Sequence, residues 1–434
     1  MKREPAEPLL ARAAVVDPAE PAAAAGRAAR GRSAAAAPTG ADFGRAWRAL
    51  APQPPTEADA RLRAIARATA RRITSPAQRA TRNPPAVALP AAMTPLQPPL
   101  PRFLQVEPVG RCNLACRMCA VPQRPAEQQA GTLSVADFER LLAQLPQLEE
   151  LHLQGLGEPM LHPAFFTLVE RAARRGIRVS ANTNATLITP SRAHACVTSG
   201  LAALSFSVDG ARAATYESIR VDGNFAKVIR NIERVVRARR ELRSATPALR
   251  LVMVLMRQNL DELPALVELA ARLGVEELLV QRLASEMNEP ALPARYIPVR
   301  RYVSDSELRG IDLAEAAAVF SAARERAVRL GIALHLPRLG APMSAVPARA
   351  DRSDAAAPAA GCDWPFAKGY VTATGEVLPC CMVGTPDRAT LGNALRDGMA
   401  AVWRGPAAQQ WRAGLLGGAP GALCAGCALY RGAF

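Results

Sequence analysis

The first three cysteines of the chain stand within eight residues, in the stretch RCNLACRMC of residues 111–119. Cys112, Cys116 and Cys119 supply soft thiolates, and a closed tetrahedral iron or zinc site normally takes four protein ligands. The nearest histidine, His152, falls on a predicted strand further along the chain. The spacing therefore predicts a metal centre with one position left open for chemistry. Half of a zinc ribbon and a chance cluster are the alternatives.

A second group of cysteines lies near the end of the chain, and one cysteine stands alone. The group consists of Cys362, Cys380, Cys381, Cys424 and Cys427. In a cytosolic protein, such groups indicate metal sites before disulfides. The lone Cys196 falls on a predicted helix, where a small core residue is the expected role.

From about residue 102, short apolar runs alternate with amphipathic stretches, which is typical of βα units around a parallel sheet. We predict six strands, in residues 102–109, 149–155, 177–184, 201–210, 249–256 and 276–283. Helices are predicted between them, among others in residues 134–145, 162–175, 225–242 and 260–273. A helix at 312–330 and a strand at 332–337 extend the series.

Polar residues at the strand ends distinguish an incomplete barrel from a doubly wound sheet. The residues concerned are Gly157, Glu158, Asn182, Asn184, Ser207, Asp209, Gln281 and Arg282. In a barrel, the carboxyl ends of the strands meet on the face that carries the active site. The three-cysteine loop follows the first strand and opens onto that face. We therefore predict an α/β fold with a partial (β/α)6 TIM-like barrel.

The CxxxCxxC motif after the first strand resembles the radical S-adenosylmethionine (SAM) superfamily. The resemblance implies that Cys112, Cys116 and Cys119 hold a [4Fe-4S] cluster whose fourth iron binds the amino and carboxylate groups of SAM. It also implies reductive cleavage of SAM to a 5′-deoxyadenosyl radical, which abstracts a substrate hydrogen. An electron donor such as a flavodoxin or a ferredoxin is then expected as a partner.

Three further motifs carry the same resemblance. GLGEP at 155–159 is similar to the motif that receives the methionine amine, NTNATL at 182–187 to the TNG turn, and SFSVDG at 205–210 to the SxDG strand. The resemblance assigns SAM contacts to Met118, Gly155, Gly157, Glu158, Pro159, Asn182, Asn184, Ser207, Asp209 and Gln281. Two positions depart from the family pattern: Met118 replaces a common aromatic residue, and Ala185 replaces the glycine of TNG.

The C-terminal cysteines resemble the auxiliary-cluster domains called SPASM and, in shortened form, twitch. Cys362 is followed by Gly375 and Cys380 in a CX12GX4C pattern, and a CxxC follows later. The resemblance implies one auxiliary [4Fe-4S] cluster bound by Cys362, Cys380, Cys424 and Cys427, with Cys381 as a substitute. A structural zinc ion with the same ligands is the alternative. A cluster without an open iron suits electron transfer.

These resemblances favour a radical SAM oxidoreductase that oxidises or modifies a small molecule, as the alcohol-oxidising relatives with a twitch domain do. Maturation of a ribosomal peptide or protein by a SPASM-type enzyme is the alternative. The formal net charge of +16 leaves a zinc-containing nucleic-acid-binding protein as a remote alternative. Residues 1–92 hold half of this excess, with 15 basic and 7 acidic residues. The remainder is only mildly basic, so nucleic acid is not expected as a partner.

Four segments are expected along the chain. Residues 1–95 form an Ala/Arg/Pro-rich, mostly disordered extension. Residues 96–340 form the barrel, 341–361 a linker and 362–434 a small cysteine-rich α+β domain. The sequence contains no apolar run of eighteen residues, so no membrane span is expected. The N-terminus does not read as a secretory signal, and we expect a cytoplasmic location.

Residues 284–311 follow the sixth predicted strand and are long enough to cover a substrate. Tyr296, Arg300, Arg301 and Tyr302 make this segment a candidate for binding an anionic or peptide substrate. A solvated surface loop is the alternative.

Overall fold

The computed structural model describes residues 96–283, 287, 289–308, 310–337, 362–427 and 429–430. All of them belong to one compact unit, residues 86–434. The expected extension at 1–95 and linker at 341–361 lie outside the described residues and stay predictions.

Seven strands run parallel to one another along the barrel part of the sheet. They are β1 (Phe103–Val106), β2 (Glu150–Leu153), β3 (Arg178–Thr183), β4 (Leu201–Ser207), β5 (Ala248–Leu255), β6 (Glu277–Arg282) and β7 (Ala333–His335). Each strand pairs with the next one in the chain. Among the described strands the two ends of the sheet do not meet. The barrel is therefore incomplete, as predicted, and the apolar run at 332–337 contributes its seventh strand.

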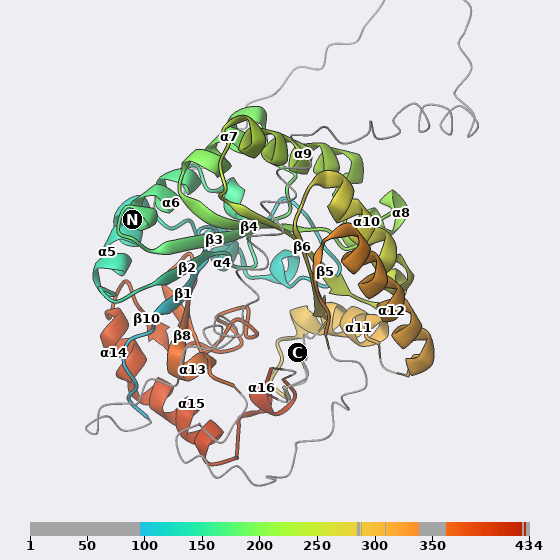
Figure 1. Ribbon diagram of the computed structural model, residues 1–434. Coiled ribbons are helices and arrows are strands. Elements are labelled where there is room, and N and C mark those ends of the chain that lie inside the picture. The colour runs from blue at the N-terminus through green and yellow to red at the C-terminus, as the bar shows by residue number, and fades with distance from the viewer. Residues whose placement is uncertain are drawn as a thin grey trace, which may run out of the picture. The chain divides into compact units, whose positions relative to one another are not determined.

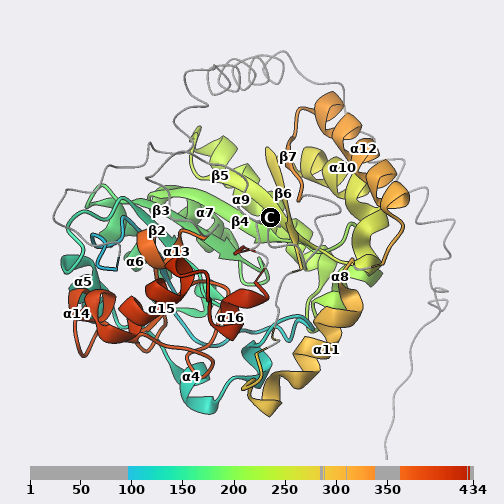
Figure 2. The same cartoon turned by 90° about the horizontal axis from the view of Figure 1, so that it is seen from below.

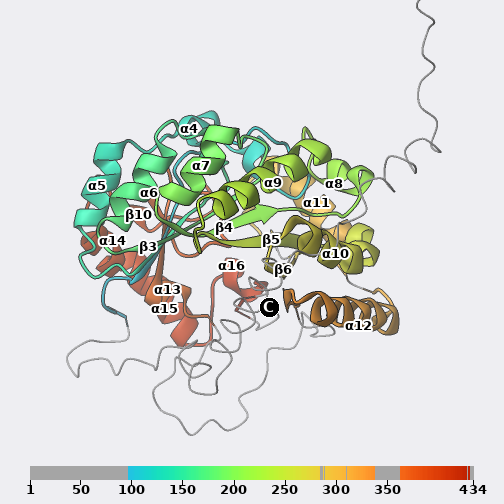
Figure 3. The ribbon, with the colours of Figure 1, turned by 45° about the horizontal axis from the view of Figure 1, so that its top comes forward.

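Amphipathic helices cover the outer face of these strands (Figures 1 and 3). They are α5 (Val135–Ala143), α6 (Phe165–Ala173), α7 (Pro190–Thr198), α8 (Ala213–Ile219), α9 (Phe225–Glu241), α10 (Leu263–Leu273) and α12 (Leu313–Leu330). At the starts of α5, α7, α9 and α12, a side-chain oxygen accepts a backbone N–H of the first turn, from Ser134, Thr189, Asn224 and Asp312. Such caps satisfy N–H groups that have no partner within the helix.

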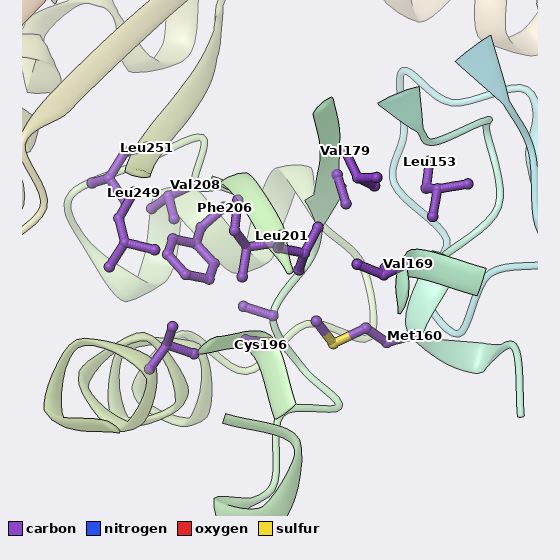
Figure 4. Close-up of a cluster of buried hydrophobic side chains, with 14 of the residues drawn as sticks. Leu153, Met160, Val169, Val179, Cys196, Leu201, Phe206, Val208, Leu249 and Leu251 are labelled. Atoms are coloured by element: carbon purple, nitrogen blue, oxygen red, sulfur yellow. The ribbon is translucent and has the colours of Figure 1, made fainter. Parts of the chain in front are cut away.

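Apolar side chains from the strands and the outer helices form one continuous core. Leu201 and Phe206 of β4 pack in this core together with Leu251 of β5 and Cys196 of α7 (Figure 4). Cys196 is fully buried. This burial agrees with the core role expected from its predicted helix.

The C-terminal part continues the same sheet. Strand β8 (Lys368–Val371) pairs in parallel with β1, and β9 (Glu376–Leu378) and β10 (Gly392–Asn393) follow in antiparallel pairs. The order in the ten-stranded sheet is β10-β9-β8-β1-β2-β3-β4-β5-β6-β7. Four helices accompany these strands, α13 (Trp364–Ala367), α14 (Met399–Arg404), α15 (Pro406–Leu416) and α16 (Ala422–Ala425). Helices α13, α14 and α15 lie at the end of the sheet formed by β8, β9 and β10 (Figure 1). The cysteine-rich part is thus joined directly to the barrel by strand pairing.

The segment after β6 is more ordered than the sequence indicated. It contains the short 3-10 helix η4 (Ala294–Tyr296) and helix α11 (Ile297–Ser306). The Tyr296 side chain is fully buried, and its hydroxyl donates to Asp387 of the C-terminal part at 2.9 Å. Helix α4 (Ala126–Ala130) lies at the same end of the barrel as α11 (Figure 2), and its Gln128 amide also donates to Asp387 at 3.0 Å. Tyr296 therefore holds the fold together and is not available to a substrate.

Among the described residues, no helix combines the length and apolarity that a bilayer crossing requires.

Candidate functional site

Backbone hydrogen bonds shape the three-cysteine loop after β1. The N–H of Ala115 donates to the carbonyl of Val221, and the N–H of Arg117 to that of Ile219, both at 3.1 Å. The Cys119 N–H donates to the Cys116 carbonyl at 3.0 Å. These hydrogen bonds attach the loop to the end of α8 and to the residues that follow it.

The glycines of the GLGEP stretch allow the chain after β2 to approach this loop closely. A Cβ atom on Gly157 would lie 1.9 Å from the Val109 carbonyl oxygen. One on Gly155 would lie 2.2 Å from Oε2 of Glu107. At Gly157 any larger residue would push the two segments apart, because the atoms that it would meet belong to the backbone.

Glu158 joins the ends of β2 and β3. Its carboxylate is 3% exposed and accepts the Met160 N–H at 3.1 Å, the Thr183 hydroxyl at 2.7 Å and the Asn184 N–H at 2.8 Å. Pro159 begins the 3-10 helix η2 (Pro159–Leu161) directly after it. Burial raises the pKa of Glu158, and the three donors lower it. Its observed role is to hold the β3 turn in place; contact with SAM stays a prediction.

The β3 turn in turn orients one of the thiols. Nδ2 of Asn184 lies 3.6 Å from Sγ of Cys112 and donates to Oδ1 of Asn113 at 3.1 Å. Ala185, which stands where the family motif has glycine, has φ of +60°. The turn therefore keeps the left-handed conformation for which glycine is usually required.

Asp209 is fully buried and makes internal contacts only. Oδ1 accepts the Val254 N–H at 2.8 Å, and Oδ2 lies 2.8 Å from Nε of Arg220. Nη1 of Arg220 in turn lies 3.9 Å from Sγ of Cys116. Asp209 thereby orients a buried guanidinium beside a cysteine of the loop.

Three further candidates for SAM binding stand at or near the carboxyl ends of their strands. Asn182, Ser207 and Gln281 are half-buried on β3, β4 and β6, and their side chains make no hydrogen bond to another described residue. Met118 packs beside the small apolar cluster that includes Ile219. Unpaired polar groups near strand ends suit the polar part of a cofactor, and an apolar cluster such as that beside Met118 suits an adenine ring.

Burial and neighbouring charges act on all three thiols of the loop. Burial raises the pKa of Cys112 to about 11 and that of Cys116 to about 12. Burial also raises the pKa of Cys119, whereas Arg124 and Arg220 lower it. The thiols of Cys112 and Cys119 each raise the pKa of Cys116. The three sulfur atoms thus interact, and cationic groups flank them.

The C-terminal cysteines line a hollow of about 530 Å³ that includes solvent at its mouth. Its lining contains Cys362, Cys380, Cys424 and Cys427, whereas Cys381 packs in an adjoining apolar cluster with Tyr370. Burial, and after it neighbouring thiols, raises the pKa of Cys381 and of Cys424 to about 12. Burial and the neighbouring thiols also raise the pKa of Cys380 well above its usual value.

In the part of the chain that the structure describes, no three Cys, His, Asp or Glu side chains converge closely enough to ligate one metal ion. A cubane cluster has no such requirement, because each thiolate binds a different iron. The donor chemistry of both sets of thiols fits an iron–sulfur cluster.

Three charged residues around the loop were not predicted from the sequence: Arg220, Glu107 and Arg124. Each is buried, yet the chain contains 54 Lys and Arg residues, most of which look alike in sequence. For Arg220, the apolar positions around it in YESIRV were the one available sign of burial.

The fold and the two cysteine sites define a class of enzyme. A profile of the Radical SAM superfamily matches residues 106–270, and a profile of SPASM, an iron-sulfur cluster-binding domain, matches residues 362–428. The chain belongs to the radical SAM superfamily and is a SPASM-containing member of it. These domains imply SAM and two iron–sulfur clusters as cofactors.

Curated relatives resemble part of the chain. The cofactor-modifying protein of the tungsten-containing aldehyde ferredoxin oxidoreductase from Pyrococcus furiosus is 28% identical over 187 residues, 42% of this chain and 51% of that protein. Mycofactocin maturase MftC from Mycolicibacterium smegmatis is 30% identical over 164 residues, 38% of this chain and 40% of that protein. PqqA peptide cyclase from Rhodopseudomonas palustris is 31% identical over 183 residues, 42% and 46% of the two chains. The match thus spans about half of these relatives' length or less.

Solved structures share the fold. The crystal structure of Streptococcus suis SuiB bound to its precursor peptide SuiA superposes with a TM-score of 0.55 at 17% identity, covering 76% of this chain and 70% of SuiB. The structure of SuiB bound to S-adenosylmethionine has the same TM-score at 16% identity, with 90% and 81% covered.

Proposed function

We propose that this radical SAM enzyme modifies a peptide made on the ribosome. The observation that carries the proposal is the similarity of part of the chain to a mycofactocin maturase and a PqqA peptide cyclase, together with a SPASM domain at residues 362–428. The sequence had favoured a small-molecule substrate and kept peptide maturation as the alternative. The relatives support the alternative better.

We assign the SAM-binding cluster to Cys112, Cys116 and Cys119, which stand in the loop that follows the carboxyl end of β1. Three thiolates on a [4Fe-4S] cluster would leave one iron for SAM, and an electron from the reduced cluster would cleave SAM to methionine and the 5′-deoxyadenosyl radical, which takes a hydrogen atom from the substrate. Asn184 and Arg220 orient the Cys112 and Cys116 sulfurs by the contacts described above. The half-buried polar groups of Asn182, Ser207 and Gln281 remain free to bind SAM.

The second cluster is assigned to Cys362, Cys380, Cys424 and Cys427, which line the C-terminal hollow. Four thiolates leave no iron open, so this centre suits electron transfer. Arg388 reaches the same hollow and forms a buried ion pair with Glu289, with 2.5 Å between Nε and Oε1. The segment after β6 is thereby attached to the cluster's surroundings.

The test is anaerobic reconstitution of the full chain, followed by incubation with SAM, dithionite and short peptides encoded beside the gene. We expect 5′-deoxyadenosine together with a mass change in one peptide. Formation of 5′-deoxyadenosine without a modified peptide, combined with turnover of a small molecule, would contradict the peptide assignment. Absence of SAM cleavage would contradict the assignment of the loop.

A small-molecule substrate is the second candidate, favoured by the relative that modifies a tungsten enzyme's cofactor and by AdoMet-dependent heme synthase from Methanosarcina barkeri, 30% identical over 177 residues, 40% of this chain and 48% of that protein. Oxidation is the expected reaction in that case, with the second cluster accepting the electron. The flavodoxin-like or ferredoxin-like electron donor and the cytoplasmic location stay predictions from the sequence.

A further inference from the structure

A buried ion pair lies between the two cysteine sites. Nη1 of Arg124 is 3.0 Å from Oε1 of Glu107, and the two side chains are 1% and 2% exposed. Glu107 directly follows β1, and Arg124 follows the loop cysteines. Replacing a buried pair by apolar residues is often neutral or stabilising, so such a pair is weak evidence for a purely structural role.

The remaining hydrogen bonds of the Arg124 guanidinium reach one carbonyl in the barrel and one in the C-terminal part. Nη2 donates to the Gly384 carbonyl at 2.7 Å, and Nη1 donates to the Gly110 carbonyl at 3.2 Å. Gly384 lies four residues after Cys380, and Gly110 lies two residues before Cys112. One guanidinium therefore fastens the chain beside both cysteine groups.

Glu107 makes the matching contacts on its other oxygen. Oε2 accepts the Leu156 N–H at 2.9 Å and lies 3.4 Å from the hydroxyl of Tyr370, a buried residue of β8. Tyr370 packs in the apolar cluster that contains Cys380 and Cys381. A continuous series of contacts thus leads from the loop through Arg124, Glu107 and Tyr370 to the C-terminal cysteines.

Both charges lie next to the loop that carries the proposed ligands of the SAM-binding cluster. Arg124 ends the short 3-10 helix η1 (Val121–Gln123), which begins two residues after Cys119, and its guanidinium contacts Gly110 two residues before Cys112. A positive charge near a thiolate-bound cluster stabilises its reduced, more negative form, and a negative charge destabilises that form. Because protein surrounds the pair, solvent screens these effects little.

We propose that Arg124 and Glu107 are positioning residues that balance the charge beside Cys119 and fasten the C-terminal cysteine part to the loop at that point. This inference rests on the proposed function, because it takes Cys119 as a cluster ligand. Arg124 makes the loop cluster easier to reduce, and Glu107 limits that effect.

The test is an equilibrium redox titration of the reconstituted full chain, followed by electron paramagnetic resonance. The signal of the loop cluster is identified by its change when SAM is added. Arg124→Gln is expected to shift its midpoint potential to more negative values, and Glu107→Gln to more positive values. The double variant should return toward wild type, and Arg124→Lys, which keeps the charge, should stay near it.

A matched control pair lies at the surface, with Arg102 directly before β1 and Glu149 directly before β2. Arg102 and Glu149 form an ion pair with side chains 57% and 56% exposed. Arg102→Gln and Glu149→Gln are expected to leave the potential unchanged, because solvent screens exposed charges. A shift in the controls as large as in the buried pair would overturn the inference.

A pair that only stabilises the fold would move the potential in one direction in both variants, or not at all, and either result would overturn the inference. If Arg124→Gln does not fold, Glu107→Gln decides alone, since the amide oxygen of the glutamine still accepts from Arg124. The absence of a positive shift in the midpoint potential of Glu107→Gln then refutes the proposal. A wild-type chain without a SAM-responsive cluster signal would instead contradict the proposed function.

Discussion

The two cysteine sites differ most in what surrounds their sulfur atoms. In the loop, Asn184 faces Cys112, Arg220 faces Cys116, and Arg124 acts on Cys119. In the C-terminal hollow, the strongest influences on Cys380 after burial are other thiols. Its neighbours there are mainly apolar.

This difference follows from the position of each site in the fold. The loop lies at the carboxyl ends of parallel strands, where polar side chains from several strands meet. The C-terminal thiols lie among short helices and β8, without such a set of strand ends. A surrounding with unpaired polar side chains suits a site that binds a polar cofactor, and a mainly apolar surrounding with four thiols suits a site that passes electrons.

The largest expected effect is on SAM cleavage. In Cys112→Ala, 5′-deoxyadenosine formation is expected to fall below detection, with loss of about four of about eight irons per chain. Chromatography of the SAM products and iron analysis measure both. Cys196→Ala serves as the control, because this buried thiol of α7 lies in the apolar core; SAM cleavage that survives in Cys112→Ala would end the distinction between the two sites.

Loss of the second centre should leave SAM cleavage in place but stop the modification of the peptide. Cys427→Ala is expected to lose about four irons and to keep SAM cleavage within about tenfold of wild type, while peptide modification is abolished. The same two assays, with mass spectrometry of the peptide, decide. Bound zinc at the C-terminal site in the wild type would show that the second centre is structural.

The close approach behind the loop predicts a stability difference between the two regions. Gly157→Ala is expected to lower the free energy of unfolding by roughly 2–3 kcal/mol, because its Cβ would overlap the Val109 carbonyl. Gly421→Ala, beside the C-terminal cysteines, has no atom within 4 Å of its new Cβ and should change stability by less than about 0.5 kcal/mol. Urea denaturation of both variants measures the contrast; equal losses would refute it.

The smallest effect is expected for the fifth C-terminal cysteine. Cys381→Ala should leave the iron content unchanged, because its thiol does not line the hollow. A loss of stability of about 1 kcal/mol is expected from its packing beside Tyr370. A loss of iron would instead make Cys381 a ligand and would require one of the other four cysteines to be free.

Much of the barrel could be predicted because its signals are local. Apolar runs separated by amphipathic stretches located β1 to β6, and the run at 332–337 contains β7. The segment after β6 was harder, since Tyr296 and the arginines near it suit an exposed binding surface as well as helix α11. Burial of Tyr296 depends on Asp387, about ninety residues away, and local patterns carry no information about such a partner.

The sequence by itself determined the type of chemistry, because ligand identity and spacing are local properties: Cys112, Cys116 and Cys119 lie in one loop that follows one strand. Only the tertiary structure decided that β8 joins β1, so that both cysteine groups belong to one sheet. It also selected Arg124 and Arg220 from many similar arginines. The reason is physical: a guanidinium is buried where distant segments supply its carboxylate and carbonyl partners, and those segments meet only in the folded chain.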